Sequence, residues 1–171
     1  VGTANKFKVL DHFEKAFRHE TVEKDQVEPA KGFLPENFPG SRHARATVKI
    51  QDGCNYRCSF CIIPEARGRS RSLPLETIEK QVVQAYHEGF KEVVLTGIHL
   101  AHYGWDHNTD LVELMRRLLS MEGPRIRLSS LDPFELPEEL LQLFATHEKF
   151  CPHFHIALQS GSDSVLSRMR R

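Results

Sequence analysis

Residues 46–61 read ATVKIQDGCNYRCSFC, and this stretch decides the interpretation of the whole chain. Its first six residues alternate between apolar and polar side chains, which predicts a β-strand. The strand leads into Cys54, Cys58 and Cys61, which have the spacing Cys-x-x-x-Cys-x-x-Cys. Three thiolates fit three corners of a [4Fe–4S] cube and leave the fourth iron without a protein ligand. An open metal position of this kind is where chemistry takes place in catalytic metal sites.

Two other roles for the cysteines are open to the sequence. A disulfide pair is disfavoured, because an odd and tightly clustered set without a signal peptide is typical of a cytosolic protein. A zinc site is the stronger rival, and it would need His43 or His99 to complete a Cys3His set. No second pair with zinc-ligand spacing follows the triplet. Cys151 stands alone before Pro152 and is interpreted as a small buried apolar residue.

The composition is that of a globular chain with a locally uneven charge. The 171 residues suffice for one domain with a sizeable core, and 23 basic residues balance 23 acidic ones. Between residues 41 and 72, however, basic side chains dominate: Arg42, Arg45, Lys49, Arg57, Arg67, Arg69 and Arg71. Such a patch beside a reactive centre suggests a phosphate-bearing partner. No apolar run reaches membrane-spanning length, and no targeting signal is recognisable, so we expect a cytoplasmic protein without a membrane partner.

The pattern along the chain predicts an α/β fold. Apolar residues at helical spacing between Phe7 and Phe17 predict a short amphipathic helix, and residues 32–40 are typical of a linker. From residue 44 onward, strand patterns alternate with helix patterns, with strands at 46–51, 92–96, 125–131 and 154–158. This repeat is the signature of βα units around a parallel sheet. The short apolar run at 92–96 is typical of a strand buried on both faces.

Helix-start signals support the same division. Pro74 is expected at the first position of one helix and Pro137 opens another. Asp110, with Glu113 three residues later, resembles a capping box, and Ser162 is expected to cap a final helix. Glycine or polar residues follow each predicted strand. In parallel barrels the reactive groups lie at these carboxyl ends of the strands.

Several runs resemble the radical S-adenosylmethionine methylthiotransferase family. They are CNYRCSFCIIP at 54–64, ARGRSRS at 66–72, VLTGIHL at 94–100, Tyr103-Gly104, LSS at 128–130, LQSGSD at 158–163 and RMRR at 168–171. The TGIHL and LSS runs favour the branch that converts N6-threonylcarbamoyladenosine in tRNA, beside the anticodon, to its 2-methylthio derivative. The resemblance implies a partial parallel (βα) barrel with about four βα units.

The resemblance also implies roles for particular residues. Cys54, Cys58 and Cys61 would hold the [4Fe–4S] cluster that cleaves S-adenosylmethionine and would form the catalytic centre. The implied cofactor-binding residues are Phe60, Thr96, Gly97, Ser130 and Gln159, and the implied RNA-binding residues are Arg67, Arg69 and Arg71. The implied partners are a tRNA substrate and an electron donor for the cluster. Two features depart from the family pattern: Glu65 stands at a usually aromatic position, and Ala101-His102 replaces a frequent Gly-Asp or Gly-Ser.

The family also has an N-terminal domain with a second cluster and a C-terminal RNA-binding module. Residues 1–40 would then be the tail of the N-terminal domain and a linker, and residues 41–171 a C-terminally incomplete radical core. Such a piece alone is expected to be an inactive part of a transferase. A sister activity, on isopentenylated adenosine in tRNA or on a ribosomal protein, stays open at this point. So does a zinc-stabilised nucleic-acid-binding module without catalysis, which metal analysis would distinguish.

Overall fold

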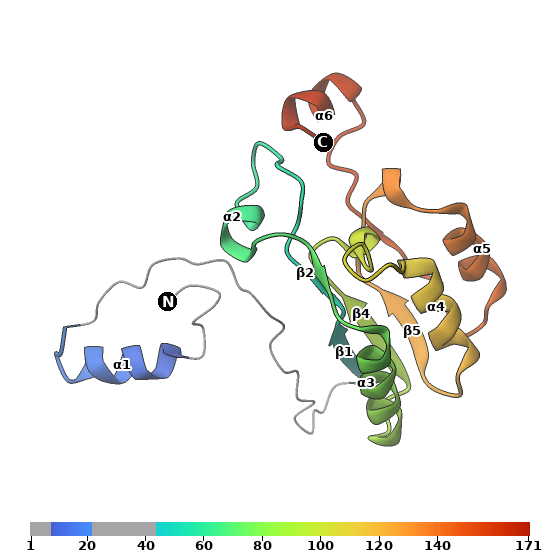
Figure 1. Cartoon of the computed structure of the whole chain (residues 1–171), viewed down its shortest axis with the longest axis horizontal. Helices are drawn as coiled ribbons and strands as arrows, with labels where there is room; N and C mark the ends of the chain where they lie inside the picture. The colour runs from blue at the N-terminus through green and yellow to red at the C-terminus, as the bar shows by residue number, and fades with distance from the viewer. Residues whose placement is uncertain (1–7, 22–43) are drawn as a thin grey trace.

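The structure, a computed structural model, describes residues 8–21 and 44–171 (Figure 1). The predicted N-terminal helix is confirmed as α1 (Val9–Phe17), which has no buried residue. Its apolar side chains, among them Phe13 and Phe17, are exposed. Phe7, the predicted linker at 32–40 and the expected domain boundary near residue 40 lie outside the described residues, so they stay predictions.

Parallel strands form the centre of the fold, as the repeat predicts. β1 (Arg45–Lys49), β4 (Glu92–Thr96) and β5 (Arg125–Leu128) form a three-stranded sheet with β4 in the middle. Two shorter strands, β6 (Ser130–Leu131) and β7 (His155–Ile156), form a second parallel pair. The predicted strand at 125–131 is therefore two strands, β5 and β6, and the predicted strand at 154–158 is only two residues long. The α/β class is confirmed.

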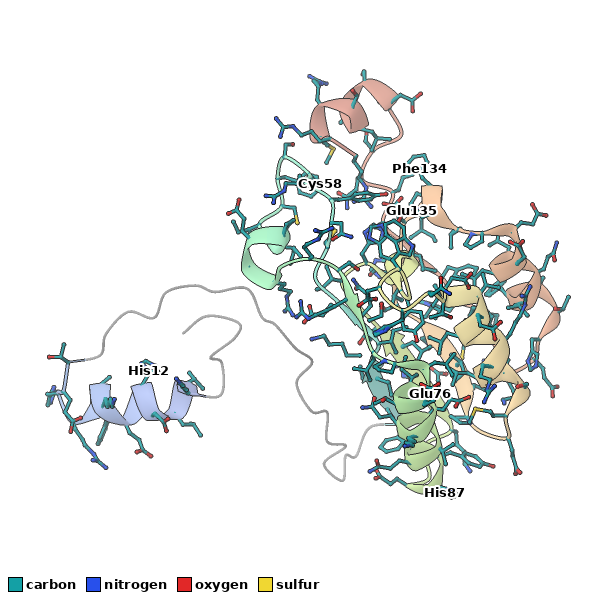
Figure 2. All side chains as sticks on the ribbon, in the orientation of Figure 1. His12, Cys58, Glu76, His87, Phe134 and Glu135 are labelled. Atoms are coloured by element: carbon teal, nitrogen blue, oxygen red, sulfur yellow. The ribbon has the colours of Figure 1, made fainter. Side chains whose placement is uncertain are left out.

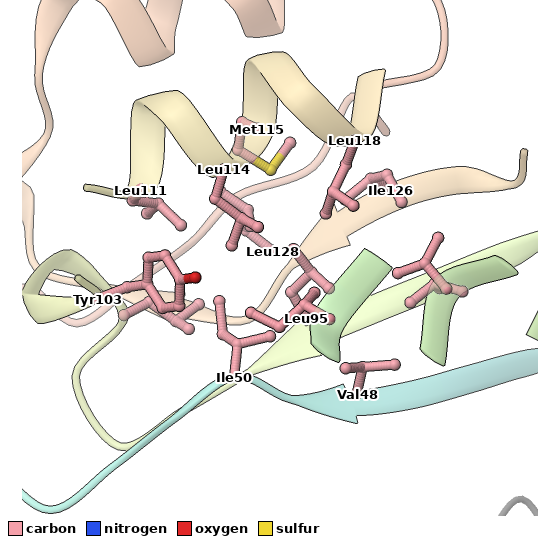
Figure 3. Packing of buried hydrophobic residues seen from close by; sticks show 14 of the residues in the cluster. Val48, Ile50, Leu95, Tyr103, Leu111, Leu114, Met115, Leu118, Ile126 and Leu128 are labelled. Atoms are coloured by element: carbon pink, nitrogen blue, oxygen red, sulfur yellow. The ribbon is translucent and has the colours of Figure 1, made fainter. Parts of the chain in front are cut away.

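Helices follow the strands: α3 (Leu75–His87), α4 (Leu111–Ser120), α5 (Glu138–Thr146) and α6 (Asp163–Met169). The first three contribute residues to the buried core over the sheet. In contrast, α6 lies away from the sheet (Figure 1), and the carbonyl of Met169 at its end accepts a hydrogen bond from the backbone N–H of Ser59 at 3.0 Å. Figure 3 shows the apolar face of α4, with Leu114, Met115 and Leu118, packed over strand residues that include Leu95 and Leu128. All five side chains are almost completely buried. Burial of a leucine or methionine side chain contributes about 1.5–3 kcal/mol, so this layer is a main source of stability.

The helix starts agree with the sequence signals except in detail. The carboxylate of Asp110 accepts a hydrogen bond from the backbone N–H of Glu113 at 2.8 Å, so this cap is confirmed. Pro74 and Pro137 each lie one residue before the first helical residue rather than within the helix. Ser162 occupies the cap position of α6, but its hydroxyl bonds Ser164 Oγ instead of a backbone N–H. The hydroxyl cap that the sequence predicts is therefore absent at this position.

The other face of the sheet is polar and partly exposed. In β4 the side chains of Val93 and Leu95 are buried, whereas Glu92, Val94 and Thr96 are only half-buried. The expectation that this strand is buried on both faces is therefore wrong for the described residues. At Glu92 the reason is electrostatic, because Arg127 donates to it at 2.6 Å from the neighbouring strand. Charged groups paired across the strands keep contact with water.

A small antiparallel ladder closes the segment that carries the cysteines. β2 (Gln51–Asp52) pairs with β3 (Arg71–Ser72). Between them lies α2 (Ile63–Arg67), a five-residue helix that the sequence patterns did not indicate. Two 3-10 turns, η2 (Leu100–His102) and η3 (Pro133–Glu135), follow β4 and β6. Within residues 8–21 and 44–171, none of the helices has the length and apolarity needed to cross a lipid bilayer.

Candidate functional site

The cysteines lie on residues 53–70, which we call the Cys loop. Its two limbs meet at the base, where the backbone N–H of Cys54 donates to the carbonyl of Gly68 at 3.1 Å. Gly53 has a φ of +73°, and a Cβ at this position would lie 2.1 Å from the carbonyl oxygen of Arg69. Only glycine fits a left-handed backbone in such close contact. The Cys loop is therefore a closed ring of chain that holds its shape at its base.

A buried carboxylate neutralises the basic side chains at that base. Asp52 is 2% exposed and accepts hydrogen bonds from Lys49 Nζ at 2.8 Å and Arg71 Nη2 at 2.8 Å. Arg67 Nη1 lies 3.2 Å from its other oxygen, which also accepts from the backbone N–H of Gly53 at 2.9 Å. Burial alone would raise the pKa of Asp52. The hydrogen bonds and charges of its partners outweigh burial and lower this pKa.

Two of the predicted RNA-binding arginines also bind Asp52 within the protein. Arg67 and Arg71 direct their guanidinium groups to Asp52, and Arg71 also donates to the carbonyl of Arg67 at 2.7 Å. Arg69 is exposed. Two of the three basic side chains thus have a role inside the protein. RNA binding by the three arginines stays a prediction, and Arg69 is the member whose exposure suits it best.

The three cysteines face one cavity of about 210 Å³. Cys54, Cys58 and Cys61 are free and half-buried. The cavity is also lined by three of the predicted cofactor-binding residues, namely Phe60, Ser130 and Gln159. Free thiols that converge on a cavity with polar walls fit the ligand set of an iron–sulfur cluster with space beside it. Figure 2 shows Cys58 and Glu135 on the same side of the molecule, away from His87 at the far end of α3.

Thr96 and Gly97 have a different position. The cavity lining, as far as the described residues show it, includes Ile98 and His99 but neither Thr96 nor Gly97. A Cβ on Gly97 would lie 2.9 Å from both Gln51 Oε1 and Leu100 Cδ2. The glycine is thus required by the packing of the protein itself. Cofactor contact by Thr96 and Gly97 stays a prediction.

Gln51 connects the Cys loop to the turn after β4. This side chain is fully buried. Its amide nitrogen donates to the carbonyl of Gly53 at 2.8 Å and to Ser70 Oγ at 2.9 Å. Its carbonyl oxygen accepts from the backbone N–H groups of Ile98 at 2.9 Å and His99 at 2.8 Å. One side chain therefore fixes the distance between the cysteines and the next strand end.

A second carboxylate, that of Glu135, is half-buried and is connected to Cys54 through His99. Oε1 of Glu135 accepts a hydrogen bond from the Tyr56 hydroxyl and lies 3.3 Å from Nε2 of His102. The other oxygen, Oε2, contacts Nε2 of His99. Burial alone would raise the pKa of Glu135, but its bonds to Tyr56 and His99 outweigh burial and lower it. The bond to Glu135 raises the pKa of Tyr56, and burial lowers the pKa of His102. We call these four residues the Glu135 cluster.

The Glu135 cluster also contacts the cysteines. His99 Nδ1 lies 3.6 Å from Cys54 Sγ. Burial raises the pKa of the Cys54 thiol. His99, His102 and Glu135 place three potential metal-ligand atoms within 4.8 Å of one another, a donor set that zinc and iron(II) accept. The position of His99 beside Cys54 is the one that the rival Cys3His interpretation requires, whereas His43 lies outside the described residues.

Gln159 has a strained backbone. Its φ of +61° is left-handed, which is uncommon for a residue with a side chain. The backbone N–H of Ser160 bonds the carbonyl of Leu158 at 2.7 Å around it, so the chain turns within three residues. Strain of this kind persists where the surroundings enforce it, and it is frequent at ligand sites. This supports a functional role for Gln159 beside the cavity.

Sequence reasoning missed several residues of the site. Tyr56, His102 and Glu135 were assigned no role, and neither was the ion pair between Arg171 and Asp132 at the cavity wall. A signal was present for the histidines, because residues at i and i+3 in a 3-10 turn lie above one another. Glu135 follows the short strand β6, at the strand end where reactive groups gather. Cys151 is fully buried, which confirms its predicted position.

Comparison with known proteins identifies the class. The sequence profile of the radical SAM superfamily matches residues 48–171, which is most of the chain. The chain therefore belongs to the radical SAM superfamily. A solved structure of TsrM, a radical S-adenosylmethionine methyltransferase from Kitasatospora setae, matches with a TM-score of 0.58 and 20% identity. The match covers 71% of this chain and 24% of TsrM, and it supports the fold alone.

Curated relatives give a narrower likeness. The chain is 50% identical over 128 residues to the threonylcarbamoyladenosine tRNA methylthiotransferase MtaB of Aquifex aeolicus, covering 74% of this chain and 31% of that protein. It is 40% identical to MtaB of Rickettsia prowazekii, covering 98% of this chain and 41% of that protein. It is 39% identical to MtaB of Bacillus subtilis, covering 100% of this chain and 39% of that protein. The chain thus spans well under half the length of these relatives.

Proposed function

We propose that this chain is the radical core of a tRNA methylthiotransferase that acts on N6-threonylcarbamoyladenosine. The observation that carries the proposal is the cavity at which Cys54, Cys58 and Cys61 meet Ser130 and Gln159. The identity to MtaB enzymes, up to 50% over three quarters of the chain, supports the choice of substrate. We place the protein in the cytoplasm, where an electron donor would serve the cluster.

In this proposal Cys54, Cys58 and Cys61 hold a [4Fe–4S] cluster, and S-adenosylmethionine occupies the space beside it. When bound, these groups supply one-electron chemistry and a methyl group. The residues of the chain position and shield them. Ser130 Oγ, which lies 3.0 Å from His155 Nδ1, and the amide of Gln159 offer polar contacts at the wall of the same cavity.

Gln51 and Glu135 control the shape of the site from outside the cavity. Gln51 holds the backbone of the Cys loop against the turn at Ile98 and His99. Glu135 holds Tyr56 and His99, which are both part of the cavity wall. Gln51 is buried, Glu135 is half-buried, and both are hydrogen-bonded, so we expect the thiols to be preorganised for the cofactors.

The first experiment tests the metal. The chain is reconstituted anaerobically with iron and sulfide, and iron, sulfide and zinc are counted together with the visible spectrum. We expect one [4Fe–4S] cluster, loss of the charge-transfer absorption on Cys58→Ala and retention on Cys151→Ala. Zinc without iron, lost on His99→Ala, would support the zinc-stabilised module instead. S-adenosylmethionine is expected to change the electron paramagnetic resonance spectrum of the reduced cluster.

The second experiment tests the substrate. A longer protein that carries this chain is expressed in cells lacking their own methylthiotransferases, and the tRNA nucleosides are analysed by mass spectrometry. We expect the methylthio derivative of threonylcarbamoyladenosine to appear, and Cys61→Ala to abolish it. A methylthio derivative of isopentenyladenosine would favour the sister activity. A relative named tRNA-2-methylthio-N(6)-dimethylallyladenosine synthase, from Clostridium botulinum, is 33% identical.

A further inference from the structure

Three aromatic rings form a stack that runs from the cysteines to the surface. The rings of His99 and His102 lie 3.8 Å apart at an interplanar angle of 13°. The indole of Trp105 lies on His102 at 3.6 Å and 26°. His102 is completely buried, whereas Trp105 is 59% exposed. The indole thus has one face packed on a buried ring, and more than half of its surface remains open to solvent.

The open side of Trp105 faces a cavity of about 400 Å³. Its wall combines apolar residues with charged ones, and acidic residues outnumber basic ones among the charged residues: Asp110, Glu113, Glu135 and Glu139 against Arg116. A phosphate inside this cavity would be repelled by the negative charges, so a nucleotide that binds here would insert its base and leave its phosphate in solvent. A further cation would share the cavity with Arg116. A neutral aromatic group whose N–H donors face the carboxylates suits both the ring and its surroundings.

We propose that Trp105 is the stacking platform for an unpaired nucleobase of the RNA substrate. This inference rests on the proposed function. Bases in single-stranded RNA loops are often splayed out and stacked on aromatic side chains. The exocyclic amino group of adenine or cytosine donates to carboxylates, as cytosine does to Glu or Asp in direct readout. The platform therefore prefers bases that carry an exocyclic amino group, such as adenine and cytosine, to uracil, which has none.

The base on Trp105 is a neighbour of the reacting nucleotide and not the reacting nucleotide itself. The reaction takes place at the cavity of the cysteines, and His99 is part of that cavity's wall. Trp105 lies behind this wall, since the ring of His102 stands between Trp105 and His99. A loop that presents one nucleotide to the cysteines can thus rest an adjacent base on the indole. This contact would fix the register of the loop.

The test uses the fact that Trp105 is the only tryptophan among the 171 residues. Its fluorescence therefore reports on this position alone. The cluster-free chain is titrated with an anticodon stem–loop RNA, a base-paired RNA duplex of equal length, tripolyphosphate and spermine. Binding of each RNA is measured separately by the anisotropy of a fluorescent label. We expect the stem–loop to quench the tryptophan about twofold and the other three probes to leave it nearly unchanged.

Variants separate stacking from a structural role. Trp105→Leu is expected to weaken stem–loop binding about 5- to 100-fold, because stacking of a base on an aromatic ring contributes in this range. Trp105→Phe keeps a ring and should restore most of the affinity. Tyr86→Leu, which removes a half-buried ring on α3, should leave affinity unchanged. Replacing the loop adenines and cytosines by uracil should reduce the quenching.

The results of these measurements distinguish the stacking proposal from its alternatives. RNA binding without a change in tryptophan fluorescence overturns the platform and leaves the proposed function intact. Quenching by spermine but not by RNA assigns the cavity to a cation and overturns the proposal. Absence of any RNA binding overturns both the platform and the RNA part of the proposed function. None of these RNA-binding results bears on cluster assembly, which the reconstitution experiment measures separately.

Discussion

Two carboxylates, the buried Asp52 and the half-buried Glu135, support the surroundings of Cys54, and they are bound by different kinds of partner. Asp52 is held by the permanent cations of Lys49, Arg67 and Arg71. Glu135 is held by a phenol and two imidazoles. The Asp52 partners carry their charge throughout the physiological pH range, so this cluster serves the shape of the Cys loop. The Glu135 partners include residues that line the cysteine cavity, so this cluster combines support with contact to the reactive groups.

The largest expected effect comes from removing the carboxylate of Asp52. Asp52→Ala leaves three basic groups at a buried position without their anion, so we expect a loss of about 3–5 kcal/mol in the free energy of unfolding. Urea denaturation followed by circular dichroism measures it. Glu65→Ala, which removes an exposed acid of the same loop, is the control. A loss below about 1 kcal/mol would show that Asp52 is not the support of the loop.

Glu135→Gln is expected to have a smaller effect on stability and a larger one on the site. The amide keeps the size of the side chain but replaces a charged acceptor, so the loss should be about 1–3 kcal/mol. The affinity for S-adenosylmethionine, measured on the reconstituted protein, should fall more than it does for a variant of equal stability loss in the core, such as Leu118→Val. Equal losses of affinity would remove the distinction between the two clusters.

The comparison extends to acid stability. Folding lowers the pKa of Asp52 below its ordinary value of 3.8. The stability due to the ionised group is therefore fully present above the unfolded pKa, and it is lost as the pH falls through the folded pKa. In denaturation series at descending pH, the native protein should lose stability in this acidic window. Asp52→Asn should lose less over the same interval, and a parallel pH dependence would contradict the assignment.

The smallest expected effect concerns Arg69. Because Arg69 is exposed, Arg69→Ala should change the free energy of unfolding by no more than about 0.5 kcal/mol. Arg71→Ala should destabilise the protein clearly, since Arg71 bonds the buried Asp52. If Arg69 contacts phosphate, its removal should lower the salt dependence of RNA binding by roughly one counterion. An unchanged salt slope would exclude Arg69 from the RNA interface.

The features that could be predicted from the sequence are those encoded by a repeated pattern or by the spacing of nearby residues. Alternating strand and helix patterns gave the parallel α/β fold, and the spacing of the three cysteines gave the centre of the site. The residues that it missed act over long distances in the chain, because Glu135 meets Tyr56 across 79 positions. No local pattern marks such a pair. The bonds of Arg67 and Arg71 to Asp52 were missed for the same reason, since a buried Asp52 is indistinguishable from an exposed one in the sequence.

The closed base of the Cys loop affects how the protein tolerates changes in length. Since Gly53 and Arg69 touch backbone to backbone, the segment between them is a tether of fixed span rather than a free end. A residue inserted within α2 or beside Gly68 would have to bulge outward, because the pairing of β2 with β3 holds both ends of the segment in place. We therefore expect insertions to cost less stability in the connections between α3, β4 and α4 than within this segment. The closed base of the loop would thus keep the three thiols at a constant spacing.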